Sequence, residues 1–331
     1  MNTLKRFLPG CLGLAVCLTA LVSCGPGNPG SWKNEQIKPS LRTDFHQRND
    51  EVFGLLKQDD AEKLKSYESA DMVDNAETLR QVERISNHLK KDDYVLLDEY
   101  YVVHKQKGEN KIVSNRNDVG NYNFGYTTQD QEMYFAFWIP KAGDNKWMIS
   151  TIWTKYNYGW KLSLLDLGKY TINGKTAPEL LKFAKEEYQK KYLVNAANAI
   201  SLASQCSVPC QGWKYAGDHE IDSLNNAIMI EANEKVRFPC TLASLPGQPR
   251  IVSIFNEEAP EGTYPAVYYI THVKLSDTTA LRKENDHIKA VIGHTLPGID
   301  KDKKFLFYSA FNEMPSSARS VKHYDMVQKI E

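Results

Sequence analysis

Between residues 43 and 92 the apolar positions recur at the spacing of an amphipathic helix. One side of the first segment carries Phe45, Val52, Phe53 and Leu56. A later segment opens on Asp74-Asn75-Ala76-Glu77, which has the form of a capping box, and its apolar side carries Leu79, Val82, Ile85 and Leu89. Asp59-Asp60 can cap a shorter helix between them. The pattern therefore predicts three helices.

From Tyr94 the period of the pattern shortens to that of a strand. The runs rich in strand-forming residues are 94–103, 122–140, 147–153 and 160–165. In the densest run, alternation places Met133, Phe135, Phe137 and Ile139 on one face and Tyr134, Ala136 and Trp138 on the other. Turn residues separate the runs, so we predict antiparallel strands.

Three helices followed by long antiparallel strands, together with Gly159-Trp160-Lys161-Leu162, resemble the nuclear transport factor 2-like superfamily, whose fold is cystatin-like α+β. The resemblance covers residues 43–172. It implies that the helices pack into the concave side of a curved sheet and that a pocket can form there. Enzymes of that superfamily place an acid or a histidine base in the pocket, and we match no residue of this chain to such a motif.

A second α+β domain is predicted over residues 176–331. Thr171 to Lys175 interrupts the strand pattern, and Thr176-Ala177-Pro178-Glu179 then forms a capping box with proline in the first turn. One helix is expected to run from there to about Ser204. Strands are expected at 235–242, 250–255, 266–274 and 304–311, and a helix at 279–292 that ends at Gly293.

The N-terminus has the three parts of an export signal. Lys5 and Arg6 precede an apolar core of about sixteen residues, which is short for a spanning helix. The core ends in Leu21-Val22-Ser23-Cys24, which resembles the lipobox of bacterial lipoprotein signal peptides. The resemblance implies that residues 1–23 are removed and that Cys24 carries a diacylglycerol and palmitate-type acyl chains.

The lipobox also implies where the mature chain is found. Residues 24–42 begin with a Gly- and Pro-rich stretch that is typical of a flexible tether. Position 25 is Gly rather than the Asp that tends to retain lipoproteins in the inner membrane. We therefore expect a protein held on the outer membrane by the lipid on Cys24 and facing the periplasm.

The net charge bears on the class of partner, and the cysteines bear on disulfide pairing. Lys and Arg number 41 and Asp and Glu number 41, so the chain has no net charge and we expect no nucleic-acid partner. The exported part keeps Cys206, Cys210 and Cys240. The short Ser207-Val208-Pro209 turn favours a disulfide between Cys206 and Cys210. A bridge from either to Cys240, or no bridge, remains open.

Aromatic residues are concentrated in the predicted sheet, where they make up 16 of the 77 residues from Tyr94 to Tyr170. Such an excess can line a ligand pocket, or it can fill the core of long strands. The candidate ligand-binding residues are Tyr101, Tyr134, Phe135, Phe137, Trp138, Trp153 and Trp160. If both faces of the sheet prove to be covered, the aromatics are core, and an assembly role is favoured.

We find no signature of a catalytic, cofactor or metal site. The chain lacks Gly-x-Ser-x-Gly, a phosphate-binding Gly-Lys-Ser/Thr loop, a dinucleotide glycine triplet and His-Glu-x-x-His. Asp218-His219-Glu220 is the densest polar triple, but adjacent residues of a strand or loop point apart. We expect an envelope protein that binds a small apolar molecule, a glycan or a protein. The alternatives are a pocket enzyme of isomerase or dehydratase type and a structural or assembly lipoprotein.

Overall fold

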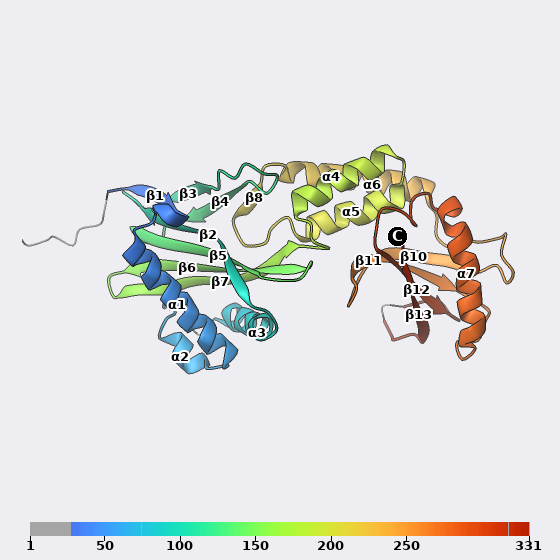
Figure 1. Cartoon of the computed structure of the whole chain (residues 1–331), viewed down its shortest axis with the longest axis horizontal. Coiled ribbons are helices and arrows are strands. Elements are labelled where there is room, and N and C mark those ends of the chain that lie inside the picture. The colour runs from blue at the N-terminus through green and yellow to red at the C-terminus, as the bar shows by residue number, and fades with distance from the viewer. Residues whose placement is uncertain (1–27, 74, 317, 331) are drawn as a thin grey trace, which may run out of the picture.

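The computed structural model describes residues 28–73, 75–316 and 318–330, and it has the α+β architecture that the sequence predicts. Figure 1 shows sheets at the two ends of the molecule and a layer of helices that runs between them. The predicted signal peptide and Cys24 lie outside the described residues. Among the helices that the structure describes, none is long and apolar enough to cross a membrane.

The three helices predicted near the N-terminus are present. They are α1 (Pro39–Lys57), α2 (Ala61–Lys65) and α3 (Ala76–Lys91). The side-chain oxygen of Asn75 caps α3, because it accepts hydrogen bonds from the backbone N–H groups of Glu77 and Thr78. Asp74, which opens the predicted capping box, lies outside the described residues.

The strands of the N-terminal half form a five-stranded antiparallel sheet and part of a smaller one. The elements are β1 (Gly30–Lys33), β2 (Tyr94–Val103), β3 (Glu109–Val113), β4 (Tyr122–Thr127), β5 (Glu132–Pro140), β6 (Lys146–Tyr156) and β7 (Gly159–Thr171). The larger sheet, called here the N-terminal sheet, has the order β1-β2-β5-β6-β7. The predicted run 122–140 is thus two strands that belong to different sheets, since β3 and β4 pair with β8 (Trp213–Tyr215).

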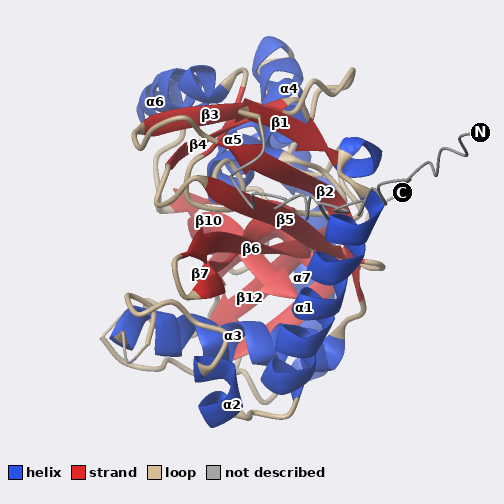
Figure 2. Ribbon diagram, turned by 90° about the vertical axis from the view of Figure 1, so that its left-hand side faces the viewer, coloured by secondary structure: helices blue, strands red, loops and turns tan. Residues whose placement is uncertain are grey.

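Helices α1 and α3 cover one face of the N-terminal sheet (Figure 2). The alternation predicted along β5 is present, and it places Tyr134, Ala136 and Trp138 on the face under these helices. The helices contribute an apolar side that includes Phe45, Val52, Phe53, Ile85 and Leu89. Tyr134 stacks on Phe45 with ring centroids 4.0 Å apart, so this face is filled by interlocking rings.

The opposite face of the N-terminal sheet is also covered. Phe135 and Phe137 of β5 pack against the β3-β4-β8 sheet and against the helical layer, which consists of α4 (Ala177–Gln189), α5 (Leu193–Gln205) and α6 (Asp218–Lys235). This buried cluster runs from Tyr100 to Ile228 and thus crosses the predicted boundary at 171–175. The division into domains at that boundary stays a prediction, and the helical layer shares its core with the N-terminal sheet.

A second five-stranded sheet, called here the C-terminal sheet, has the order β13-β12-β11-β10-β9. Its elements are β9 (Cys240–Thr241), β10 (Arg250–Ala259), β11 (Gly262–Ile270), α7 (Thr278–Thr295), β12 (Phe305–Phe311) and β13 (His323–Lys329). The pairs are antiparallel except β11 and β12, which α7 connects as a parallel crossover. The buried side of α7 carries Leu281, Ile288 and Ile292 onto this sheet.

The prediction of a single helix from Thr176 to about Ser204 is wrong, because the helix is interrupted between α4 and α5. Lys191 has a φ of +65°, in the left-handed region, which a continuing helix cannot adopt. The predicted capping box of Thr176 and Glu179 is confirmed at the start of α4. The break turns the chain back, so α5 packs beside α4 instead of extending it.

Two further expectations in the second half need correction. The strand predicted over 235–242 shrinks to the two residues of β9, because its first residue ends α6. Neither α6 nor β13 was expected. Apolar residues of α6 lie on both its buried and its exposed sides, with Ile228 buried and Ile230 62% exposed, so helical periodicity is weak there.

The cysteines of the described residues are free thiols. Cys206 and Cys210 are buried, and burial raises the pKa of the Cys206 thiol to about 12. The predicted disulfide between them is not formed in the structure. Cys206 instead directs its thiol toward the backbone oxygen of Leu202, 3.3 Å away, so pairing in solution stays a prediction for non-reducing mass spectrometry.

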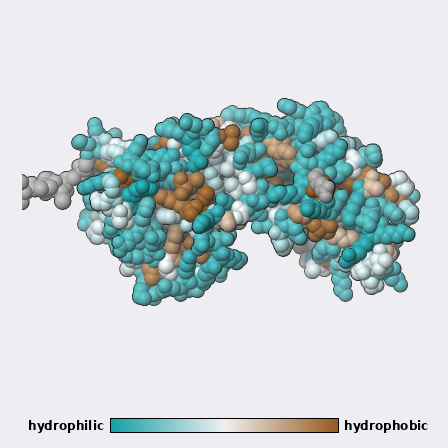
Figure 3. All heavy atoms as spheres, viewed as in Figure 1, coloured by the Kyte–Doolittle hydropathy of each residue, from teal (hydrophilic) through white to brown (hydrophobic). Residues whose placement is uncertain are grey.

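The surface is mostly hydrophilic on the face shown in Figure 3, with apolar atoms gathered in a small patch over each half. The large apolar side chains that are exposed lie far apart in the sequence and include Val119, Val208, Ile230 and Met314. Scattered exposure of this kind is common on soluble domains and does not by itself mark an interface.

Candidate functional site

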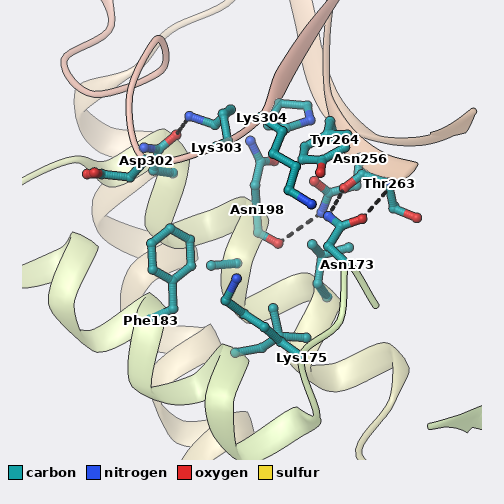
Figure 4. A pocket seen from close by; sticks show the side chains of 15 residues that line it. Asn173, Lys175, Phe183, Asn198, Asn256, Thr263, Tyr264, Asp302, Lys303 and Lys304 are labelled. Carbon is teal, nitrogen blue, oxygen red and sulfur yellow. Dashed lines mark hydrogen bonds between the residues drawn. The ribbon is translucent and has the colours of Figure 1, made fainter. Parts of the chain in front are cut away.

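A cavity of about 310 Å³ lies between the helical layer and the C-terminal sheet (Figure 4). We call it the seam cavity. It is lined by Asn173, Lys175, Leu180, Phe183, Asn195, Asn198, Ala199, Leu202, Asn256, Thr263, Tyr264, Pro265, Asp302, Lys303 and Lys304. This size is near the lower end of ligand pockets, which begin at about 300 Å³, so the cavity suits a small molecule.

Helix α5 supplies the floor of the seam cavity. Asn198 and Ala199 lie three and four positions after Asn195, so both lie near it on one side of the helix. The small side chain of Ala199 leaves space above the helix. The backbone oxygen of Asn198 accepts a hydrogen bond of 2.9 Å from the side-chain nitrogen of Asn256 on β10, and this bond joins the floor to the C-terminal sheet.

Two buried amide atoms at this contact have no partner in the described structure. They are the side-chain nitrogen Nδ2 of Asn198 and the side-chain oxygen Oδ1 of Asn256. One is a donor and the other an acceptor, so a molecule that both accepts and donates a hydrogen bond would satisfy both. Leaving a buried polar group unpaired costs about 1–3 kcal/mol, and a ligand that pairs it removes that penalty.

Cations lie at the rim of the seam cavity. The Lys175 amine is 5.9 Å from the centre of the Phe183 ring, and no acidic partner of Lys175 occurs among the described residues. Figure 4 shows Lys175 and Phe183 beside Asn198 around a common space. Lys304 is 3.4 Å from Asp144, but both side chains are exposed, so water and salt screen that pair. The rim therefore favours an anionic group.

The deeper lysine of the cavity is already engaged by the protein. The Lys303 amine donates to Oδ1 of Asn195 at 2.7 Å and to the backbone oxygens of Ile299 and Lys301 at 2.8 and 2.5 Å. Burial lowers the pKa of Lys303 to about 8. With its donors used on these oxygens, Lys303 holds the loop before β12 in place rather than contacting a ligand.

Asn195 links this lysine to a second buried charge. Its side-chain nitrogen donates to the carboxylate of Glu187 at 2.7 Å, and Glu187 is completely buried. The Lys190 amine lies 2.8 Å from the Glu187 carboxylate and 2.9 Å from the Asp302 carboxylate, so one cation pairs with both acids. The network is satisfied internally and fixes α4, α5 and the loop before β12 as one wall of the cavity.

An asparagine also fastens the other side of the seam. The Asn173 side chain donates to the backbone oxygen of Thr263 at 2.5 Å and accepts from its backbone N–H at 2.9 Å. This pair of bonds imitates the pairing of a strand with β11. Asn173 has a φ of +52°, a conformation that Asn adopts more easily than most residues.

The structure places five of the seven sequence-predicted site residues in the core: Tyr134, Phe135, Phe137, Trp138 and Trp153. Tyr134, Trp138 and Trp153 lie under α1, and Phe135 and Phe137 lie under the β3-β4-β8 sheet and the helical layer. Both faces of the N-terminal sheet are covered by other elements, so most of these rings are core. Trp138 also lines a separate cavity of about 440 Å³ together with Phe53 and Tyr94, and a ligand-binding role for the aromatic set stays a prediction.

The remaining two predicted residues are half-buried and also engaged in packing. The hydroxyl of Tyr101 donates to Glu132 at 2.5 Å, and its ring stacks on Trp32 at 5.5 Å. Trp160 meets the ring of Phe45 edge-on at 4.7 Å. Neither residue lines the seam cavity.

The densest cluster of titratable groups lies elsewhere, between α1 and β2. Glu99 is completely buried and accepts hydrogen bonds from Arg42 and from the hydroxyl of Tyr134, with the His46 ring 2.8 Å away. A carboxylate beside a histidine can perform acid–base chemistry. Here Glu99 is closed to solvent, whereas the His46 side chain is 37% exposed, and the cluster joins α1 to the sheet.

The sequence-based search missed the asparagines of the seam. Asn195 and Asn198 stand on a helix whose other residues are mostly apolar, and that contrast was a usable signal. Asn256, which bonds Asn198, and Lys303, which bonds Asn195, lie more than fifty residues further along the chain, so the cavity itself could not be inferred. Among the described residues, no group of His, Cys, Asp or Glu is arranged to hold a metal ion.

We compared the chain with known protein families, with curated proteins and with solved structures, and none of them matches it. The resemblance to the nuclear transport factor 2-like superfamily thus rests on the order of elements and on Gly159-Trp160-Lys161-Leu162 in the sequence, and it stays a prediction. The proposal for the function is therefore based on the geometry and chemistry of the seam cavity.

Proposed function

We propose that this protein is a lipid-anchored protein of the bacterial envelope that binds a small ligand in the seam cavity. The observation that carries the proposal is the pair of unpaired buried amide atoms on Asn198 and Asn256, two residues that line a cavity of ligand size. Folded proteins satisfy most of their buried polar groups, so unpaired ones that line a cavity favour a missing partner.

A binding role is favoured over catalysis by the chemistry of the lining. Amides, aliphatic groups and aromatic rings dominate the cavity, and these groups recognise molecules without transforming them. The ionisable groups that reach inward, Lys303 and Asp302, are occupied by protein partners. No nucleophile stands beside a general base in this lining, as a covalent mechanism would require.

The alternative is a structural or assembly role. The burial of both aromatic sets favours it over ligand binding at the N-terminal sheet, as the sequence analysis anticipated. The seam cavity keeps ligand binding as the better proposal, since a protein that only docks others gains nothing from unpaired buried amides beside an open space.

Fluorine-detected NMR screening of small fragments against the mature protein in detergent tests the binding proposal. Fragments should bind, and Ala199→Phe, which fills the floor of the cavity, should abolish their signals. Phe183→Trp narrows the same space from a half-buried position and serves as a second variant should Ala199→Phe unfold. The proposal would be contradicted if fragments bound both variants as well as the wild type, or if the folded wild-type protein bound no fragment.

The anchor is tested independently of the ligand. Cys24→Ala should leave the unprocessed precursor and abolish labelling of the protein by a fatty-acid analogue in bacteria. Ser23→Ala, which keeps the small residue before the cysteine, serves as the matched control and should be processed normally. Normal labelling of Cys24→Ala would remove the lipid anchor from the proposal and leave the cavity unaffected.

A further inference from the structure

The seam cavity offers a ligand three kinds of contact in one space. The Asn198 nitrogen offers a donor and the Asn256 oxygen an acceptor, both buried and unpaired. Lys175 offers a cation at the rim that has no acidic partner in the described part of the chain. Phe183, Leu202 and other aliphatic neighbours offer an apolar wall. A ligand that uses all three must combine these chemistries.

We infer that the seam cavity binds a short peptide, or an N-acylated amino acid, that carries a free carboxylate. This inference rests on the proposed binding function and names the ligand class for the same site. A peptide group has the required oxygen acceptor and N–H donor, so it can pair with Asn198 and Asn256 together. The terminal carboxylate then faces Lys175 at the rim, and a small aliphatic side chain packs against Phe183.

The lining argues against two other ligand classes. A purely apolar molecule such as a fatty acyl chain would bury the two amide atoms without pairing them, which costs free energy at each atom. A phosphorylated ligand would require several converging donors. The cavity offers Lys175 and Lys304 at its rim, whereas the Lys303 amine is held by Asn195 and backbone oxygens.

The size of the cavity sets the length of the peptide. A volume of about 310 Å³ accommodates an acylated dipeptide rather than a long chain. The rim is open toward solvent at Lys175, which is exposed. The carboxylate end therefore meets water, and its contact with Lys175 is a partly screened ion pair that contributes modestly to affinity.

Calorimetric titration of the mature protein with defined probes tests the inference. The probes are N-acetyl-Ala-Ala with a free carboxylate, the same compound as a terminal carboxamide, and N-acetylglucosamine, which has an acetamide but no charge. We expect the acid to bind about fivefold more tightly than the carboxamide, the range of one exposed ion pair. The sugar should bind more weakly than either.

Variants assign each contact to its residue. Lys175→Gln should remove the preference for the acid over the carboxamide, and Lys175→Arg should restore it. Asn198→Leu should weaken both peptides by about tenfold, because both lose the same hydrogen bond. Lys191→Gln is the matched control: Lys191 is an exposed lysine of the same layer whose amine lies 5.2 Å from the Tyr188 ring, outside the cavity.

The outcomes separate this inference from the proposed function. The acid and the carboxamide could bind equally well, with binding of both lost in Asn198→Leu. That result would overturn the inferred role of the carboxylate and leave the proposed binding function unaffected. Fragment binding in the cavity with no binding of either peptide would overturn the peptide class. If the protein is folded and binds neither a fragment nor a probe, both the inference and the proposed function are overturned.

Two sources share this chemistry, namely the C-terminus of a protein and the stem peptide of the cell wall, whose terminal residues have the D configuration. Titration with N-acetyl-L-Ala-L-Ala and N-acetyl-D-Ala-D-Ala distinguishes them. Tighter binding of either isomer in the native protein, lost in Asn198→Leu, supports the inference and identifies the source. Binding of neither isomer overturns it.

Discussion

The two faces of the N-terminal sheet and the seam cavity are built from opposite kinds of side chain. On the sheet, rings pack directly on rings, as Tyr134 of β5 does on Phe45 of α1 with centroids 4.0 Å apart. At the seam cavity, amides dominate, and Asn198 and Asn256 keep atoms without a partner. On the sheet, the Trp138 Nε1 and the Tyr94 hydroxyl are also unpaired, but they belong to aromatic side chains packed in the core. The region with the most unusual composition is therefore core, and the region with ordinary composition carries the candidate site.

The difference has a physical cause. Aromatic rings gain stability from any close apolar neighbour, so a sheet rich in them fills its own space once helices cover both faces. An amide gains nothing from burial unless a directed partner is present. Unsatisfied amides beside open space are thus a stronger sign of a binding site than an excess of aromatic residues.

The largest effect is expected from Trp153→Ala, which opens a void under α1. Trp153 is completely buried, and its indole N–H donates to Asn49 at 3.1 Å. Truncation of a buried aromatic costs about 3–5 kcal/mol, so urea unfolding should show a loss of this size. Affinity for the ligand of the seam cavity should stay unchanged in the protein that remains folded.

Trp160→Ala is the control for that variant, because Trp160 belongs to the same predicted set but is only half-buried. It should cost clearly less than Trp153→Ala. A loss of ligand affinity in either variant without a loss of stability would contradict the assignment of these residues to the core.

The next effect is a pH dependence of stability that comes from the wall of the seam. Burial lowers the pKa of Lys303 to about 8, whereas the unfolded chain keeps the ordinary lysine value near 10.5. Between these values the unfolded state binds more protons than the folded state, so the contribution of Lys303 to stability rises with pH from about 8 to 10.5.

The size of this effect is at most about 3 kcal/mol across that interval. It is measured as the difference between the wild type and Lys303→Met in urea unfolding at pH 7.5, 8.5 and 9.5. The free energy of unfolding of the wild type should increase relative to that of Lys303→Met as the pH rises. A constant difference would mean that the amine keeps its proton, held by Asn195 and the backbone oxygens around it.

Much of the fold could be predicted because hydrophobic period and caps are local properties. The three N-terminal helices, the alternation along β5 and the capping box at Thr176 all follow from neighbouring residues. The break at Lys191 could not be predicted, because the sequence there has no glycine or proline. Contacts of Asn195 with Gly298 and of Lys190 with Asp302 hold that turn, and these partners lie more than a hundred residues away, outside the local pattern.

The candidate site could not be predicted for the same reason. Its donors and acceptors come from α5, β10 and the loop after β7, and only the packing of the helical layer on the C-terminal sheet brings them together. The aromatic excess was visible, but covering elements decide whether rings form a pocket or a core. The cover over β5 includes β8 and α5, which follow it by more than fifty residues.

A smaller effect is expected from Asn173→Ala at the edge of the seam. The change removes two hydrogen bonds to Thr263 and places alanine at a φ of +52°. We expect a loss of about 2 kcal/mol in urea unfolding. Asn173→Gly relieves the backbone strain and keeps the loss of the bonds, so it should be less harmful. Equal losses would show that the side-chain bonds account for the whole effect.

The smallest effect on stability, and the one with an unusual sign, is expected from Asn198→Leu. The Asn198 nitrogen is buried without a partner in the unliganded protein, so replacing the amide by an aliphatic group of similar size removes an unpaired donor and loses no bond. The backbone oxygen that accepts from Asn256 is unaffected by the change. We expect thermal unfolding to show no loss or a gain of up to about 1 kcal/mol, together with weaker ligand binding. Asn195→Leu is the matched control on the same face of α5. Its amide is bonded to Glu187 and Lys303, so the same substitution there should clearly destabilise the protein. A large loss of stability in Asn198→Leu would mean that this amide is a structural group, and the contrast between core and site would then fail at its central residue.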